Sequence, residues 1–429
     1  MTKPDPRPSR FSKTISSLRF RNYRLLFIGT VFSHTGDFMQ AIAQSWLVWT
    51  LTGSPFLLGV VGFSQAVPRL LLSAIGGAIV DRMDRRRLLL LTQYLAMLQA
   101  FSFWALVYFD LIQFWQIILL VLFLGTVNSL NQTARQSLIN TLVPRAELMN
   151  AIALNSSVVN LSKVIGPSLG GVLISMIGVA GCLLVNAVSF LAIIVSLVMM
   201  ELPLSPREEG TADFWGEVTE GYRYARSNHR VFAALLLTYV VALVGSPYSR
   251  FLPVFASDIL HVGPSGFGFL LAAPGVGAVF SGLRLAALGN IRRRSHFMIM
   301  SAFVFALFLI LFSFSRSMIL SFLCLIMVGS SHIALRATAN ATVQMETPPQ
   351  LLGRTLSLLF MDKCLWSFGT LFIGSIASLV GTPQAIAISG FICALAATVL
   401  MYRRERAAER PLPAEELEKA LANSEVEAP

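Results

Sequence analysis

Long apolar stretches follow one another along most of this chain, and they limit its fold more than any other feature. A bilayer core is crossed by about 20 helical residues, and twelve stretches reach roughly that length. They lack the polar–apolar alternation of membrane barrel strands, and helices pair their backbone polar groups internally within lipid. The predicted helical spans are residues 25–51, 56–80, 88–109, 114–135, 149–177, 180–200, 231–256, 267–289, 297–314, 317–340, 353–380 and 384–402.

The composition agrees with an all-α membrane protein. Hydrophobic residues make up 55% of the chain and charged residues only 13%, whereas soluble domains carry about 25% charged residues. This deficit excludes an ordinary soluble enzyme, a disordered chain and a disulfide scaffold. The four cysteines all fall in apolar spans without metal-binding spacing, so we expect buried hydrophobes and neither a metal site nor a cofactor.

The basic residues predict how the spans are oriented. Most of the 33 Lys and Arg residues lie in the two tails and in every second loop, whereas Arg316 lies on the opposite side. Because cytoplasmic loops retain positive charge, both termini should be cytoplasmic and the number of spans even. The formal charge of +11 then reflects topology, and no nucleic-acid partner is expected.

The chain divides into two halves around a polar linker. Within that linker, Phe214, Val218, Tyr222 and Ala225 recur at helical spacing and predict a short amphipathic helix on the membrane surface. The predicted parts are a cytoplasmic tail at 1–24, a six-helix bundle at 25–200, the linker at 201–230, a second six-helix bundle at 231–402 and a cytoplasmic tail at 403–429.

Weak internal similarity indicates that the second half repeats the first. The segment LVPRAELMNAIAL follows the fourth span, and METPPQLLGRTLSL follows the tenth at nearly the same offset. Both repeats begin on the same side of the membrane, which predicts a parallel duplication. Transporters built in this way hold their substrate near the midplane, between the two repeats.

The loop after the second span carries a family resemblance. It contains Gly77, Asp81, Arg82, Arg85 and Arg86, and it resembles the G-x-x-x-D-R-x-G-R-R/K signature of the major facilitator superfamily. Asp84 stands where that signature has glycine. The resemblance implies two pseudo-symmetric bundles and a cytoplasmic latch. In that latch Asp81 docks against the start of helix 11 near Arg354, and Arg135 ends helix 4 nearby.

A second motif lies in the fifth span. Gly166, Pro167, Gly170 and Gly171 resemble the G-P-x-x-G-G core seen in antiporters of that superfamily, although the same residues would also suit a generic tight helix crossing. The flanking sequences look like the branch of drug:proton antiporters that contains enterobactin exporters and macrolide efflux pumps. This resemblance implies a bacterial inner-membrane exporter that exchanges its substrate for protons.

Polar side chains on the first span point to a coupling site. At 3.6 residues per turn, Ser33, Asp37, Gln40 and Gln44 share one narrow face, and Asp37 is the one acid deep in this half. Charged groups inside spans cost about 2.5–3.5 kcal/mol on insertion scales. We interpret Asp37 as a proton or substrate-coupling site with Arg69 as its partner; a structural ion pair or a packing group is the alternative. His34 could join a relay or simply pack.

Further polar faces predict a basic cavity between the halves. Such a cavity favours an anionic or amphipathic substrate. Asp362 and Lys363 point apart, so we expect one of them to find a partner on helix 8 or 10. The remaining candidates for the cavity are Asn128 and Gln132 beside Arg135, Asn160 beside Lys163, Tyr239 beside Arg250, and His332 beside Arg336.

The sequence contains no phosphate-binding G-x-x-x-x-G-K-[ST] loop and no hydrolase constellation. We therefore predict that the chain is no enzyme, and the family resemblance implies a secondary active exporter, which we expect to be a monomer. Its substrate would be a small amphipathic or anionic molecule, siderophore or drug-like, exchanged for protons across the lipid bilayer. The alternatives are a lysophospholipid flippase-like or other uncoupled facilitator of the same superfamily, an intramembrane enzyme, or a sensor.

Overall fold

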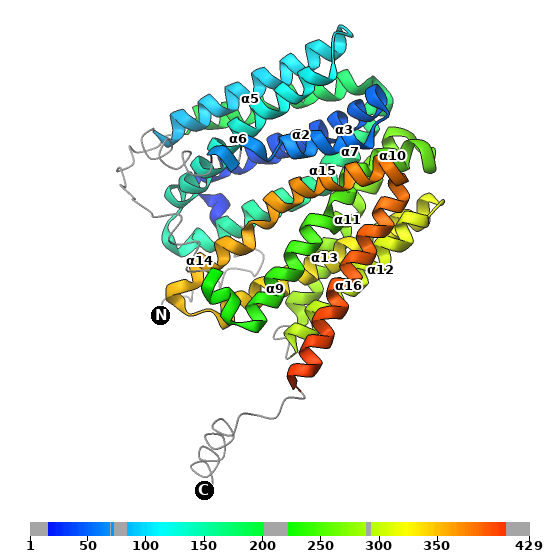
Figure 1. Ribbon diagram of the computed structural model, residues 1–429. Helices are drawn as coiled ribbons and strands as arrows, with labels where there is room; N and C mark the ends of the chain where they lie inside the picture. Colours follow the sequence, from blue (N-terminus) through cyan, green and yellow to red (C-terminus); the bar gives the residue numbers. More distant parts are fainter. Residues whose placement is uncertain (1–15, 69, 73–83, 201–221, 289–292, 409–429) are drawn as a thin grey trace, which may run out of the picture.

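The computed structural model describes residues 16–68, 70–72, 84–200, 222–288 and 293–408 (Figure 1). Within these ranges the regular structure is helical. Nine of the described helical segments are long and apolar enough to cross a membrane, and α3 is a shorter apolar helix. The chain is therefore an all-helical membrane protein.

The first group of helices forms the N-terminal bundle. Between α2 and α3 the chain turns at Gly53, whose φ of 56° is left-handed, and Ser54 then caps α3 by accepting the Leu57 N–H. The helices are α2 (Arg21–Thr52), α3 (Pro55–Ser64), α5 (Arg85–Tyr108), α6 (Phe114–Leu142) and α7 (Leu148–Val198).

Helix α7 is a hairpin of two helices that both pack on α2. Gly178 interrupts it with φ 74° and ψ 176°, a conformation that glycine adopts without strain. Before this turn, Gly166 lies against Phe38 and Gly170 against Ile42, so the two helices run in the same direction. After the turn, Cys182 contacts Met39 and Asn186 lies beside Gly36. The order along α2 reverses, so the two segments are antiparallel, as the predicted spans 149–177 and 180–200 require.

The second group forms the C-terminal bundle, which lies below the first in Figure 1. Its first span, predicted at 231–256, is irregular because Pro247 and Pro253 cannot donate backbone hydrogen bonds. It consists of α9 (His229–Val240), a π turn (Val241–Gly245), a 3₁₀ turn (Ser246–Phe251), α10 (Leu252–Val254) and a second π turn (Phe255–Ile259). The helices that follow are α11 (Gly263–Leu288), α12 (Arg294–Phe314), α13 (Met318–Glu346), α14 (Pro349–Phe360), α15 (Asp362–Val380) and α16 (Thr382–Ala408).

Three further predicted spans differ from the observed helices. The span at 114–135 continues to Leu142, because Leu138, Ile139 and Leu142 extend its buried face. The span at 56–80 is interrupted by a turn after Ser64, and the span at 353–380 is divided at Met361 into α14 and α15. Apolar length alone predicted the membrane segments but not these interruptions.

Matching contacts in the two bundles support the predicted duplication. The Tyr23 hydroxyl on α2 donates to the Ala151 carbonyl of α7 at 2.7 Å. In the other bundle, the Tyr239 hydroxyl on α9 donates to the Leu358 carbonyl of α14 at 2.6 Å.

Each bundle also has a surface ion pair at the corresponding place. Arg19, before α2, binds Glu147 at 2.9 Å, and Arg230, in the first turn of α9, binds Glu346 at 2.9 Å. In each bundle, an arginine at the start of the first span therefore holds the connection after the fourth.

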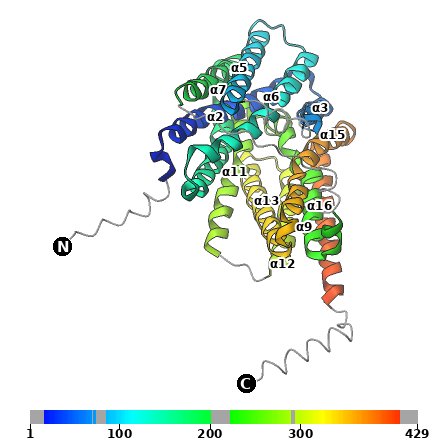
Figure 2. The same ribbon diagram turned by 90° about the vertical axis from the view of Figure 1, so that its left-hand side faces the viewer.

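The two bundles touch mainly through α3 with α15 and α7 with α11 (Figure 2). The Thr370 hydroxyl on α15 donates to the Gly59 carbonyl of α3 at 3.1 Å. A Cβ added to Gly171 of α7 would lie 2.9 Å from the Cα of Gly268 on α11. These contacts lie near one end of the helices, where the chain turns at residues 53–54, 178, 260–262 and 381. We call this half of the molecule the contact half. The opposite half, with the helix ends at Arg21 and Ala408, is the terminal half.

Candidate functional site

Asp37 lies on α2 and its side chain is 38% exposed. Its Oδ2 is 3.5 Å from Nδ1 of His34, one turn earlier. On its other side, His34 Nε2 is 2.8 Å from Nη1 of Arg135, which projects from the buried face of α6. The three side chains form a continuous chain from an exposed carboxylate to a buried guanidinium.

The direction of these hydrogen bonds follows from arginine, which has donors and no acceptor. His34 Nε2 must therefore accept from Arg135, and a neutral His34 carries its hydrogen on Nδ1, facing Asp37. The predicted partner Arg69 lies outside the described residues. The structure thus places His34 directly beside Asp37, a contact that a relay would need.

The glutamines on the same helix lie deeper than Asp37. Gln40 is buried; it donates to Gln99 Oε1 at 3.2 Å and accepts from Asn186 at 2.6 Å, so it joins three helices of one bundle. Gln44 is also buried, and its Nε2 has no hydrogen-bond partner among the described atoms. Of the predicted polar face, Asp37 is the member that is reached from outside.

Arg250 links the two bundles. It is buried, and its guanidinium donates to Ser45 Oγ at 3.2 Å and to Gln65 Oε1 at 2.8 Å, both in the N-terminal bundle. The guanidinium carbon also lies 5.4 Å from the ring centroid of Trp366. Trp46 stacks on Phe267 nearby, with centroids 6.0 Å apart. Arg250 is therefore part of the contact that closes this half of the molecule.

A second acid–base pair lies in the C-terminal bundle. Arg336 Nη1 on α13 is 2.7 Å from Asp362 Oδ2 on α15. This confirms the expectation that Asp362 or Lys363 would find a partner on helix 8 or 10. One turn from Arg336, His332 Nε2 lies 3.5 Å from the Ser246 hydroxyl and its ring packs near Phe305.

The other predicted polar residues divide into two kinds. Tyr239 uses its hydroxyl to hold the Leu358 carbonyl, a contact within the C-terminal bundle. The rest are exposed in the middle of apolar helices, where contact with lipid would be costly. An aqueous opening is the favourable environment for these four residues, Asn128, Gln132, Asn160 and Lys163.

Only part of the cytoplasmic latch motif can be located. Gly77, Asp81, Arg82 and the side chain of Arg85 lie outside the described residues. Arg86 donates to the Leu197 carbonyl at 3.0 Å and the Val198 carbonyl at 2.6 Å, so it caps the end of α7.

Two further residues of the predicted latch are seen. Arg135 does not end its helix but lies within α6, where it contacts His34. Arg354 is partly exposed on α14. The motif comparison did not predict the role of Asp84, whose carboxylate accepts the Arg87 N–H at 2.8 Å and caps α5. An aspartate directly before a helical run is a recognisable cap signal.

The glycines of the fifth-span motif lie at two crossings. Added Cβ atoms on Gly166 and Gly170 would lie 2.6 Å from Phe38 and 2.5 Å from Ile42, both on α2. Gly171 faces α11 of the other bundle, and the carbonyl of Pro167 lies 2.5 Å from a Cβ added to Gly268. The motif therefore packs one helix against its own bundle and against the other bundle at once.

Two helical bundles that meet around buried and exposed polar side chains define a membrane transporter. The family model described as transmembrane secretion effector matches residues 12–427. The chain belongs to this family of the major facilitator superfamily, whose members are transporters and not enzymes.

Curated relatives cover most of the chain at low identity. The staphyloferrin A transporter of Staphylococcus aureus is 23% identical over 86% of this chain and 92% of its own length. The enterobactin exporter EntS of Shigella boydii is 25% identical over 81% of both chains. Macrolide efflux protein A of Streptococcus pyogenes is 21% identical over 74% of this chain and 80% of its own length.

Solved structures share the fold. A bacterial homologue of the human lysosomal transporter Spinster superposes with a TM-score of 0.71 at 16% identity, covering 92% of this chain and 99% of that structure. The resemblance to the major facilitator superfamily inferred from sequence motifs is therefore confirmed.

Proposed function

We propose that the chain is a secondary active exporter of a small amphipathic or anionic molecule, siderophore or drug-like, in exchange for protons. It would cross the bacterial inner membrane twelve times, with both termini in the cytoplasm, and act as a monomer. The bundles would comprise residues 25–200 and 231–402, joined by the linker 201–230. The named relatives, which handle a siderophore or a macrolide, support this class of substrate.

Transport would proceed by alternating access between the two bundles. The closest described contacts between bundles lie in the contact half, whereas the partly or fully exposed residues Asp37, Lys163 and Arg336 lie midway along their helices or nearer the terminal half. If the terminal half faces the cytoplasm, the described state is open to that side. This arrangement supports loading of the substrate from inside the cell.

The chain from Asp37 through His34 to Arg135 carries the proposal of proton coupling. In the ionised state, Asp37 balances the charge of buried Arg135 through the His34 ring. Protonation of Asp37 would remove this balance and leave a buried charge uncompensated, which is unfavourable. The protonated and ionised forms would therefore favour different arrangements of the helices, as coupling to a proton gradient requires.

The test is uptake into proteoliposomes that hold the full chain, with and without an imposed pH gradient. Two probes share one aromatic body: 2-naphthoate is anionic and 2-naphthylmethylammonium is cationic. We expect the gradient to drive accumulation of a probe by wild type, and Asp37→Asn to remove the dependence on the gradient. Accumulation that ignores both the gradient and the substitution would contradict proton exchange through Asp37.

A matched control is Asp110→Asn. Asp110 is an exposed acid with φ of 55° between α5 and α6, a conformation that asparagine also accepts. The substitution removes one carboxylate far from Asp37 and His34, so transport by Asp110→Asn should match that of wild type.

A further inference from the structure

Asp362 is an acid whose surroundings satisfy only part of its charge. Its side chain is 5% exposed, and Oδ2 binds Arg336 at 2.7 Å. The other oxygen, Oδ1, is buried without a hydrogen-bond partner among the described residues. A buried carboxylate is stable only when it is well paired. Asp362 is therefore bound to Arg336 through one oxygen, and the charge of the adjacent Lys363 also acts on it.

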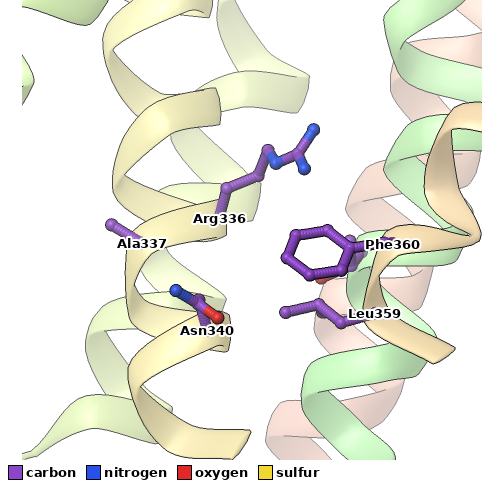
Figure 3. Close-up of a pocket in the computed structure, with 6 residues that line it drawn as sticks. Arg336, Ala337, Asn340, Leu359 and Phe360 are labelled. Carbon is purple, nitrogen blue, oxygen red and sulfur yellow. The ribbon is translucent and has the colours of Figure 1, made fainter. Parts of the chain in front are cut away.

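Besides its contact with Asp362, Arg336 lines a cavity. Its side chain is 34% exposed, and a guanidinium has five donors, more than one carboxylate oxygen can use. The cavity has a volume of about 220 Å³ and its wall combines a cation, an amide, a hydroxyl and apolar side chains (Figure 3). It is lined by Arg336, Thr238, Ala337, Asn340, Leu359 and Phe360.

Positive charge from both bundles gathers near this cavity. Lys163 on α7 is exposed, and the cations Arg336 and Lys363 of the other bundle lie close enough to repel it. Its backbone carbonyl lies 3.8 Å from a Cβ added to Gly275 of α11, which places it at the boundary between bundles. Lys163 has no carboxylate within 4.0 Å among the described residues, so no salt bridge offsets its charge there.

We propose that Arg336 and Lys163 bind the acidic group of an organic anion whose apolar body lies against Leu359 and Phe360. The anion would compete with the Asp362 carboxylate for Arg336. This inference rests on the proposed transport function and narrows its substrate from amphipathic or anionic molecules to organic anions. The amide of Asn340 offers a further hydrogen bond on the same wall.

The competition would connect ligand binding to the contact between bundles. Asp362 begins α15, and Thr370 on the same helix donates to Gly59 of the N-terminal bundle. An anion that releases Asp362 from Arg336 loosens the start of α15 from α13. The helix that closes the contact half therefore senses whether the cavity is occupied.

The experiment measures binding to the full chain in nanodiscs of phosphatidylcholine by calorimetry, without any gradient. The probes are 2-naphthoate, 2-naphthylmethylammonium and neutral 2-naphthalenemethanol. We expect 2-naphthoate to bind best. Arg336→Gln and Lys163→Gln should each weaken it about tenfold, a loss between that of an exposed ion pair and that of a buried one, and leave the neutral probe unchanged.

Asp362→Asn gives the sharpest readout, because it should tighten 2-naphthoate by removing the internal competitor. A merely structural role would predict weaker binding of every probe. Arg316→Gln is the matched control, since Arg316 is an exposed cation between α12 and α13, and it should bind like wild type.

The proposal is overturned if 2-naphthoate binds no better than the other two probes. It is also overturned if Lys163→Gln, an exposed position that should fold normally, binds 2-naphthoate as wild type does. If a folded Asp362→Asn variant binds 2-naphthoate more weakly than wild type, the anion does not compete with Asp362 for Arg336. None of these results depends on proton coupling, which the Asp37→Asn transport assay tests separately.

Discussion

Substitution of Arg250 by glutamine should open the contact half of the molecule. The guanidinium makes its hydrogen bonds to Ser45 at 3.2 Å and Gln65 at 2.8 Å across the bundle boundary. These bonds require the two bundles to be in contact there. A state that separates the bundles on this side loses them, so the substitution destabilises one state selectively.

The size of the effect follows from the contacts. A hydrogen bond from a charged donor contributes about 1.5–3 kcal/mol, and an arginine stacked on an aromatic ring adds about 0.5–2 kcal/mol. The cost of burying the guanidinium offsets part of this sum. A net loss of about 2 kcal/mol would change the ratio of the two states by about 30-fold.

Spin labels at Phe56 and Leu379 would report the change. Both side chains are exposed; Phe56 lies on α3 and Leu379 near the end of α15, beside the contact between these helices. Electron–electron resonance should give one short distance in wild type and an added longer distance in Arg250→Gln. The partly buried Cys364 is replaced by serine in both proteins.

Arg316→Gln serves as the control, because it removes an exposed arginine without a contact between bundles. A distance distribution that is the same in wild type and Arg250→Gln would refute the role of Arg250. The role of Arg250 would also be refuted if Arg316→Gln shifted the distance distribution as much as Arg250→Gln does.

Three further outcomes concern stability. Gly170→Leu should lower the melting temperature by several degrees, since overpacking costs about 1–3 kcal/mol, whereas Gly353→Ala, where an added Cβ meets nothing within 4 Å, should not. Tyr239→Phe should cost about 1 kcal/mol by removing the hydroxyl donor to the Leu358 carbonyl, which then keeps only the Met361 N–H, read by thermal unfolding in detergent. Asp84→Ala should cost a similar amount by removing the cap of α5, with faster hydrogen exchange in the first turn of that helix; unchanged exchange there would contradict the cap.

Helical periodicity predicted which residues share a face, but not what that face meets. Periodicity groups Ser33, Asp37, Gln40 and Gln44 on one face of the first span. In the structure Gln40 points into its own bundle while Asp37 is reached from outside. Which of these side chains is buried and which is accessible depends on how α2 is rotated about its own axis. That rotation is set by packing on α7, which cannot be read from the sequence of α2 alone.

Pairs within one bundle were easier to anticipate than pairs between bundles. The sequence predicted that Asp362 or Lys363 would find a partner on helix 8 or 10, because adjacent residues on a helix point apart, and the structure pairs Asp362 with Arg336 on helix 10. The bonds from Arg250 to Ser45 and Gln65 were not expected, because they depend on which half of the molecule is closed. Likewise, His34 beside Asp37 was visible from its spacing, whereas its contact with Arg135 required the crossing of α2 and α6.

The most direct test of the central claim is proton movement driven by substrate. Proteoliposomes holding the full chain and the pH dye pyranine are diluted so that 2-naphthoate flows down its own gradient through the protein. Exchange through Asp37 predicts that wild type moves protons in the opposite direction, that Asp37→Asn carries the probe without a pH change, and that Asp110→Asn behaves as wild type. Flow of 2-naphthoate through wild type with no change in internal pH would contradict the account.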